Sequence, residues 1–176
     1  MAAPYISIPI IDEFVRFVEE DSQYEDSVKA MALTILSHYF QAMSGYSVIS
    51  EAYRNNGIPD FVIVRIQRRF PGDRSIVDHT MVEAKKTTDS LNESMEQLEG
   101  YLENANTEFG RCYGLLVRGP YFMFYEYHKQ FPINDRYVPW GPPNQPHQNT
   151  FHARHDSATI DWMLRHMEQN PLPPLR

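Results

Sequence analysis

The sequence of 176 residues contains very little cysteine, because Cys112 is the single one. One cysteine cannot form an internal disulfide, and no group of cysteines and histidines has the spacing of zinc ligands. We therefore expect neither a disulfide framework nor a structural zinc site. At this length a single domain can bury a sufficient hydrophobic core, so residues 1–176 are expected to form one domain.

Long apolar runs are also missing. No stretch approaches the roughly 18 consecutive apolar residues of a membrane span. The first residues, MAAPYISIPII, lack the basic region and the long apolar run of a secretory signal. We therefore expect an intracellular protein, in the cytoplasm or the nucleus, without a membrane partner.

An excess of positive charge is absent as well, since the net charge is −7. Affinity for phosphate backbones comes mostly from Lys and Arg, so this charge argues against a uniformly basic nucleic-acid-binding surface. The charge is uneven, however, because residues 54–86 hold seven basic side chains against four acidic ones. The basic ones are Arg54, Arg65, Arg68, Arg69, Arg74, Lys85 and Lys86.

The hydropathy pattern predicts an α/β (α+β) fold in which a mixed central β-sheet is flanked by helices. Apolar residues at helical spacing predict helices, and β-branched or aromatic runs bounded by turn residues predict strands. A segment rich in Pro, Asn, Gln and His predicts irregular chain over about 131–155. The expected helices are 11–21, 25–43, about 90–105 and about 157–169; the expected strands are 46–52, 58–66, 75–85, 112–118 and 121–127.

Two carboxylates are expected to meet in the hairpin formed by strands 58–66 and 75–85, which turns at Pro71-Gly72. A hairpin turning there brings positions whose numbers sum to about 143 opposite each other, as those of Asp60 and Glu83 do. Because side chains alternate between the faces of a strand, Lys85 projects from the same face as Glu83. The sequence therefore predicts that two acids and a base lie together.

Such a group of side chains is typical of a metal site. Adjacent carboxylates repel each other unless a cation lies between them, and hard carboxylate oxygens select Mg²⁺ or Mn²⁺. A divalent ion lowers the pKa of a bound water and stabilises charge that develops on a phosphate, while a nearby ammonium helps to position or deprotonate the nucleophile. The pattern thus indicates metal-dependent phosphodiester hydrolysis.

A family resemblance points the same way. Pro59-Asp60 followed by Glu83-Ala84-Lys85 resembles the PD-(D/E)XK motif of the restriction-endonuclease-like nuclease superfamily. The order of the later segments is most similar to the N-terminal nuclease domain of type I restriction enzyme motor subunits. These segments are Gln97-Leu-Glu-Gly-Tyr-Leu102, Tyr113-Gly-Leu-Leu-Val-Arg-Gly119 and Phe122-Met-Phe-Tyr125, and the resemblance covers roughly residues 20–127.

The resemblance implies a restriction-endonuclease-like core and Mg²⁺- or Mn²⁺-dependent hydrolysis of DNA. The implied metal ligands are Asp60, Glu83 and the backbone carbonyl of Ala84, with Lys85 beside the attacking water. It further implies that Gln97 and Glu25 support the site, and Glu51 is an additional acidic candidate. Glu25 and Gln97 each have an ordinary interpretation as well. Glu25 can be an acid in the first turn of a helix, where the helix dipole favours it, and Gln97 can be a polar position on a helix surface.

Other interpretations remain open at this stage. Arg65, Arg68, Arg69 and Arg74 either bind phosphate or keep the hairpin turn hydrated, whereas the place of Lys86 beside the site favours phosphate. RNA is an alternative substrate, since the metal chemistry is the same on either backbone. The charge of −7 also suits a catalytically inactive nuclease-like fold that acts as a binding or assembly module. By analogy with small enzymes that cut two strands, a homodimer is a further hypothesis.

Overall fold

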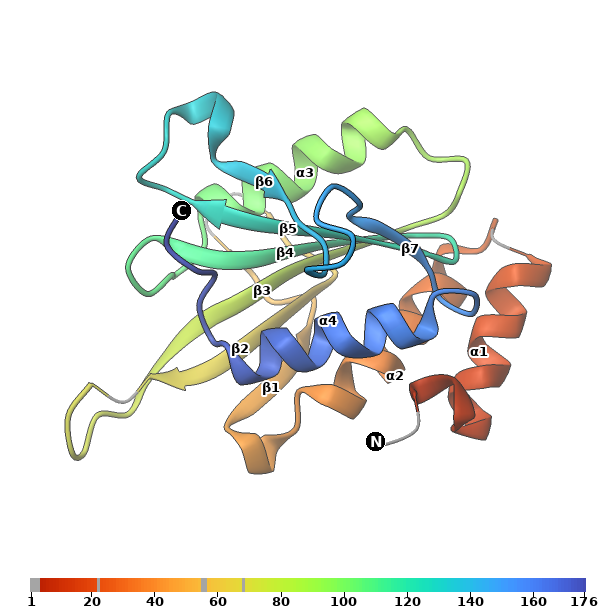
Figure 1. Ribbon diagram of the computed structural model, residues 1–176, viewed down its shortest axis with the longest axis horizontal. Helices are drawn as coiled ribbons and strands as arrows, with labels where there is room; N and C mark the ends of the chain where they lie inside the picture. Colours follow the sequence, from red (N-terminus) through yellow and green to blue (C-terminus); the bar gives the residue numbers. More distant parts are fainter. Residues whose placement is uncertain (1–3, 22, 55–56, 68) are drawn as a thin grey trace.

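The computed structural model describes residues 4–176 except 22, 55–56 and 68, and it contains a seven-stranded mixed sheet (Figure 1). The strands follow the order β1-β2-β3-β4-β5-β6, and β7 also pairs with β5. The pair β3–β4 is parallel and the other pairs are antiparallel. Their bounds are β1 Tyr46–Ser50, β2 Phe61–Gln67, β3 Ser75–Lys85, β4 Arg111–Arg118, β5 Tyr121–His128, β6 Tyr137–Pro139 and β7 Thr150–His152.

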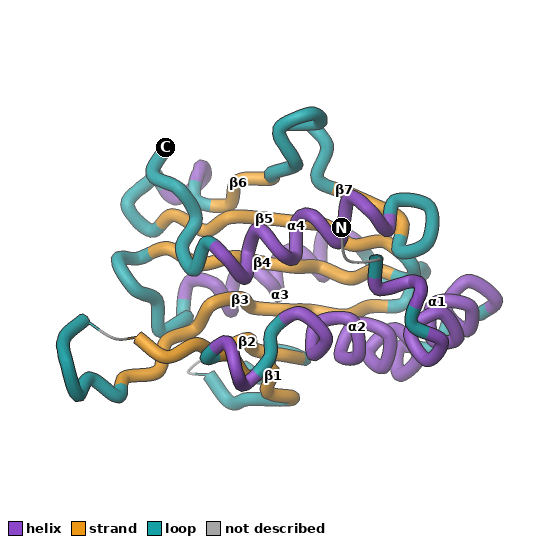
Figure 2. The backbone as a smooth tube through the Cα atoms, turned by 60° about the horizontal axis from the view of Figure 1, so that its bottom comes forward, coloured by secondary structure: helices purple, strands orange, loops and turns teal. Residues whose placement is uncertain are grey.

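The described residues form four α-helices around this sheet: α1 (Pro9–Glu20), α2 (Glu25–Tyr39), α3 (Leu91–Glu103) and α4 (Ser157–Gln169). Helix α3 lies on one face, α2 and α4 lie on the other, and α1 packs on α2 beyond the end of the strands (Figure 2). Parallel strands need a crossover connection, and α3 provides it between β3 and β4. The predicted mixed α/β sheet flanked by helices is confirmed.

The two faces of β3 belong to different cores. Met81 packs in the core beneath α3, whereas Val82 and Ala84 pack in the larger core beneath α2 and α4. Because side chains alternate along a strand, Glu83 and Lys85 project from the α3 face. The core on that face comprises Val62, Val64, Met81, Leu98, Leu102, Cys112, Leu116, Tyr125 and Tyr127.

A register shift between Ile63 and Val64 leaves His79 as an extra residue in β3. The His79 ring is fully buried, with Nε2 at 2.9 Å from the Met167 carbonyl and Nδ1 at 2.7 Å from Thr80 Oγ1. Burial lowers the pKa of this imidazole to about 3. Its hydrogen bond to Met167 joins the central strand to the end of α4.

The predicted elements differ most from the structure in two places. Residues 131–155 are not wholly irregular, because β6 and β7 lie within them; at three residues each, they are too short to show strand periodicity. The second helix ends at Tyr39 rather than at residue 43, since the chain turns through a short 3₁₀ helix over Ala42–Ser44. Gly45 then takes a positive φ of 86°, which glycine tolerates without strain. None of the described helices is long and apolar enough to cross a membrane.

Candidate metal centre

The candidate site lies where β2 begins and β3 ends. Phe61 pairs with Val82, so the hairpin register predicted from the sequence is confirmed next to Asp60. The backbone N–H of Ala84 donates a hydrogen bond of 2.8 Å to Asp60 Oδ2. This bond holds the Asp60 carboxylate against the backbone between Glu83 and Lys85.

Glu83 is a buried acid with one paired and one unpaired oxygen. Its Oε1 lies 2.6 Å from Lys85 Nζ, whereas its Oε2 is buried and has no hydrogen-bond partner among the described residues. Burial raises the pKa of Glu83 and the charge of Asp60 adds to this, while Lys85 opposes both. A further cation beside the Glu83 carboxylate would therefore stabilise its negative charge.

Lys85 is held as an ammonium ion. Burial is the largest single influence on its pKa and lowers it, but the carboxylates of Glu83, Asp60 and Glu25 together raise the pKa above its ordinary value. In the structure Lys85 is thus a donor and a positive charge beside Glu83, and not a free base.

Lys29 is a site residue that the sequence analysis missed. Its Nζ lies 2.8 Å from Asp60 Oδ1 and 2.8 Å from Glu25 Oε1, so Glu25 reaches Asp60 through this lysine. Desolvation raises the pKa of Glu25, but Lys29, Lys85 and Lys86 outweigh it and the net shift is downward. The available signal was the four-residue spacing of Glu25 and Lys29, which puts both on one helix face.

The carbonyl of Ala84 faces the same side as Asp60. The Lys85 carbonyl accepts a 2.8 Å hydrogen bond from Gly119 N–H and so points toward β4. Successive strand residues direct their backbone groups to opposite edges, and the N–H of Ala84 already points to Asp60. The Ala84 carbonyl therefore lies on the Asp60 side of β3.

These oxygens form a suitable donor set for a hard cation. Asp60 Oδ1, Glu83 Oε2 and the Ala84 carbonyl are all oxygen ligands, which Mg²⁺ and Mn²⁺ prefer. The buried, unpartnered Glu83 Oε2 supports the fit, because such an atom normally has a partner. The residues present fit a divalent metal, provided that Lys29 releases Asp60.

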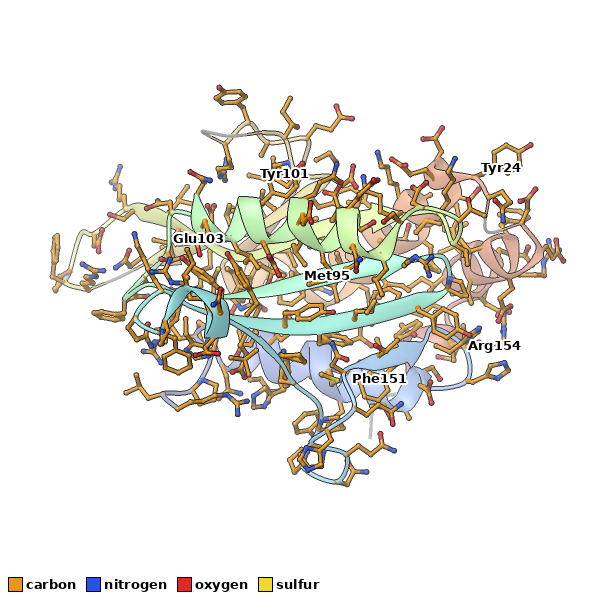
Figure 3. All side chains as sticks on the ribbon, turned by 90° about the horizontal axis from the view of Figure 1, so that it is seen from above. Tyr24, Met95, Tyr101, Glu103, Phe151 and Arg154 are labelled. Carbon is orange, nitrogen blue, oxygen red and sulfur yellow. The ribbon has the colours of Figure 1, made fainter. Side chains whose placement is uncertain are left out.

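Tyr101 of α3 borders the site and was also missed. Its ring packs on Gly57, where an added Cβ would lie 2.8 Å from Tyr101 Cε1, and Figure 3 shows it on the side of α3 near the loop before β2. Burial raises the pKa of the Tyr101 hydroxyl, with smaller contributions from Glu83 and Asp60 that Lys85 opposes. The signal was its position one helical turn after Gln97.

The other supporting residues lie at the margin. Gln97 is exposed, and in the described part of the chain no hydrogen bond joins its side chain to the carboxylates. The Glu51 side chain is exposed too, although its backbone N–H donates to the Asp60 carbonyl at 2.9 Å. Glu51 thus helps to fix the chain at Asp60 through its backbone.

Three of the four hairpin arginines, Arg65, Arg69 and Arg74, lie toward the far end of the β2–β3 pair. Arg65 is buried in an ion pair with Glu108, and the Arg69 guanidinium lies 5.2 Å from the centre of the Phe109 ring. Arg74 is exposed in the turn, and Arg68 lies outside the described residues. At about 3.3 Å per strand residue, Arg65 is roughly 16 Å from Asp60. The structure separates Arg65, Arg69 and Arg74 from the carboxylates.

Lys86 is the basic residue of the predicted phosphate-binding set that lies at the carboxylate end. It follows Lys85 directly, and its Nζ lies 3.9 Å from Asp89 Oδ1. Its side chain is 41% exposed, so it is free to meet a ligand.

A second group of metal-ligand type, Glu19, His152 and His155, has ligand atoms within 4.8 Å of one another. The Arg154 guanidinium already binds Glu19 at 2.9 Å. His152 Nδ1 accepts the backbone N–H of Arg154 at 3.2 Å, so a neutral ring carries its proton on Nε2, the nitrogen nearer Glu19. We assign no metal to this group, because Arg154 already binds Glu19 and the His152 nitrogen nearer to Glu19 carries a proton.

Comparison with known proteins supports the fold alone. No protein-family model matches the sequence, and no curated protein matches it. The structure is similar to part of the restriction enzyme DrdV in a cryo-EM structure of its DNA complex, with a TM-score of 0.53 and 15% identity over 94% of this chain. It is also similar to part of the type IIG restriction endonuclease BpuSI, with a TM-score of 0.51 and 15% identity over 82% of this chain. This chain spans 14% and 16% of those two chains, and its fold resembles parts of restriction enzymes.

Proposed function

We propose that this protein is a Mg²⁺- or Mn²⁺-dependent nuclease of the PD-(D/E)XK type that hydrolyses phosphodiester bonds in DNA. The observation that carries the proposal is the convergence of Asp60, Glu83 and Lys85 at one end of two paired strands, with a buried Glu83 oxygen left unpartnered. The restriction-enzyme-like fold supports it, and one of the similar structures contains DNA.

Each residue has a defined part in this proposal. Asp60, Glu83 and the Ala84 carbonyl would hold the metal, which when bound supplies an acidified water and stabilises charge on the phosphate. Glu83 holds the Lys85 ammonium in place, where its remaining protons can be donated to the attacking water or to a phosphate oxygen. The side chains of Tyr101 and Lys86 extend the polar surface on which a strand would lie.

The test is cleavage of plasmid and oligonucleotide DNA with Mg²⁺ or Mn²⁺. We expect Asp60→Asn and Lys85→Ala each to reduce the rate by about 10²-fold or more, because each removes a charged group from the reacting centre. Asp135→Asn and Lys129→Ala are matched controls, since both residues are exposed and outside the site. A wild-type protein that binds Mn²⁺ but cleaves no DNA or RNA substrate would contradict the proposal.

Two alternatives belong to the same experiment. RNA oligonucleotides in the substrate panel test RNA cleavage, which needs the same metal chemistry. Helix α3 favours the second alternative, an inactive binding or assembly module. This helix lies on the face of the sheet that holds Glu83, and it carries no basic residue but four acidic ones, Glu93, Glu96, Glu99 and Glu103. Calorimetry with Mn²⁺ separates this alternative, because a protein that binds no metal at millimolar concentration is such a module.

A homodimer is proposed as the form that cuts both strands of a duplex. Sedimentation of the protein with and without DNA tests the oligomeric state.

A further inference from the structure

Lys29 lies at the point in the site where positive charge is needed. It bridges two carboxylates from different parts of the chain, at 2.8 Å from Asp60 Oδ1 and 2.8 Å from Glu25 Oε1. The Asp60 side chain is only 11% exposed, so water screens this contact weakly. Without a bound metal, the Lys29 ammonium is the direct counter-charge of Asp60.

Both oxygens of Asp60 are engaged in this arrangement. Oδ2 accepts the N–H of Ala84, a backbone contact that anchors the side chain to β3, and Oδ1 accepts from Lys29. Oδ1 is therefore the oxygen that a metal would take. A divalent ion at hydrogen-bond distance from an ammonium ion meets strong repulsion in a partly desolvated site. Metal and ammonium thus compete for Asp60.

Lys29 has an alternative position that keeps its charge compensated. The lysine side chain is flexible, and that of Lys29 is 29% exposed, so its ammonium can move. Glu25 lies one helical turn earlier on α2 and already holds the other side of the ammonium. The ammonium can therefore leave Asp60 and remain paired with Glu25.

We propose that Lys29 is a built-in counter-cation that holds Asp60 in the metal-free protein and moves onto Glu25 when a divalent ion binds. The inference rests on the proposed metal site. It makes Lys29 a positioning residue that lowers the affinity for metal and, in exchange, stabilises the metal-free protein.

The test is titration of Mn²⁺ by calorimetry, together with thermal unfolding, on the wild type and on Lys29→Met. We expect the affinity of Lys29→Met for Mn²⁺ to rise about tenfold, because the competing charge is gone. We expect its metal-free Tm to fall by several degrees, since Asp60 and Glu25 lose their shared partner, and saturating Mn²⁺ to restore it.

Arg16→Met is the matched control. Arg16 also bridges two carboxylates, at 2.7 Å from Glu13 and 2.6 Å from Glu20, but it does so on the exposed face of α1. Its removal should leave the affinity for Mn²⁺ within about twofold of the wild-type value, because an exposed, distant charge is screened.

The outcomes separate the two proposals. Equal or weaker Mn²⁺ binding by Lys29→Met, with clear binding by the wild type, would overturn the role of Lys29 and leave the metal site standing. No Mn²⁺ binding by either protein would overturn both. If circular dichroism shows that Lys29→Met does not fold without metal, the titration is made on Lys29→Gln, which keeps a polar donor on this side chain without the positive charge.

Discussion

At the scale of single residues, Glu83 and Asp60 differ in how their oxygens are satisfied. Asp60 has a partner for each oxygen, whereas Glu83 keeps one buried oxygen without a partner among the described residues. A buried polar atom without a partner costs about 1–3 kcal/mol, and such costs persist where function requires them. A metal would therefore have to displace Lys29 from Asp60, whereas it would displace no described partner from Glu83 Oε2.

The pH dependence of stability is a prediction at this scale. The pKa of His79 falls to about 3 on folding, below its ordinary value of about 6.5, so the unfolded chain binds the proton more readily. Stability should fall as pH decreases below about 6.5, and the loss from this one group between pH 7 and pH 5 should be about 2 kcal/mol.

Urea unfolding of the wild type and His79→Gln at both pH values measures this effect. The variant should lose less stability on acidification than the wild type, by about 2 kcal/mol. His147→Gln serves as the control, since His147 is exposed, and should behave as the wild type does. An equal acid-induced loss in the wild type and His79→Gln would refute the assignment.

At the scale of elements, α3 is decisive for the site because it both connects β3 to β4 and supplies Tyr101. Its start is defined by Ser90, whose Oγ accepts the backbone N–H of Glu93 at 3.3 Å. Ser90 lies five residues after Lys85, so the loss of this cap acts close to the site.

Ser90→Ala should therefore destabilise the protein by about 1 kcal/mol, because the helix loses a side-chain acceptor for a free N–H. Ser37→Ala is the matched control, since Ser37 is an exposed interior position of α2 where alanine favours the helix. Chemical denaturation measures both. A Ser90→Ala variant as stable as the control would show that the cap contributes nothing.

At the scale of the whole molecule, residues 131–176 share the core of the part of the chain that holds the candidate site. Met163, Leu164 and Met167 of α4 lie in the same cluster as Val82 and Ala84 of β3. Arg176 lies 2.7 Å from the buried Glu126 of β5, and Tyr113 donates to the Asn170 carbonyl at 2.9 Å. The C-terminal segment should therefore unfold together with the sheet.

Leu164→Ala tests this coupling. Leu164 is fully buried, so its truncation should cost about 2–5 kcal/mol and lower the unfolding midpoint seen by far-ultraviolet circular dichroism and by tryptophan fluorescence to the same extent. Leu175→Ala, at a leucine that is 79% exposed, should change stability by less than about 0.5 kcal/mol. Two separate transitions in Leu164→Ala would show that the segment folds independently.

The sequence by itself determined the hairpin, the register that brings Asp60 toward Glu83, and the start of α3. These features depend on local rules: alternation along a strand, the length of a turn and the spacing of a cap all act over a few residues. Residue types within one hairpin are therefore enough to predict that the two acids meet.

Only the tertiary structure decided what surrounds those acids. Lys29 reaches Asp60, and Tyr101 reaches the loop before β2, because helices on opposite faces of the sheet pack at particular distances from its edge. The three-residue strands β6 and β7 exist through hydrogen bonds to β5. Such contacts join residues far apart in the chain, and their geometry follows from packing, which no short sequence pattern specifies.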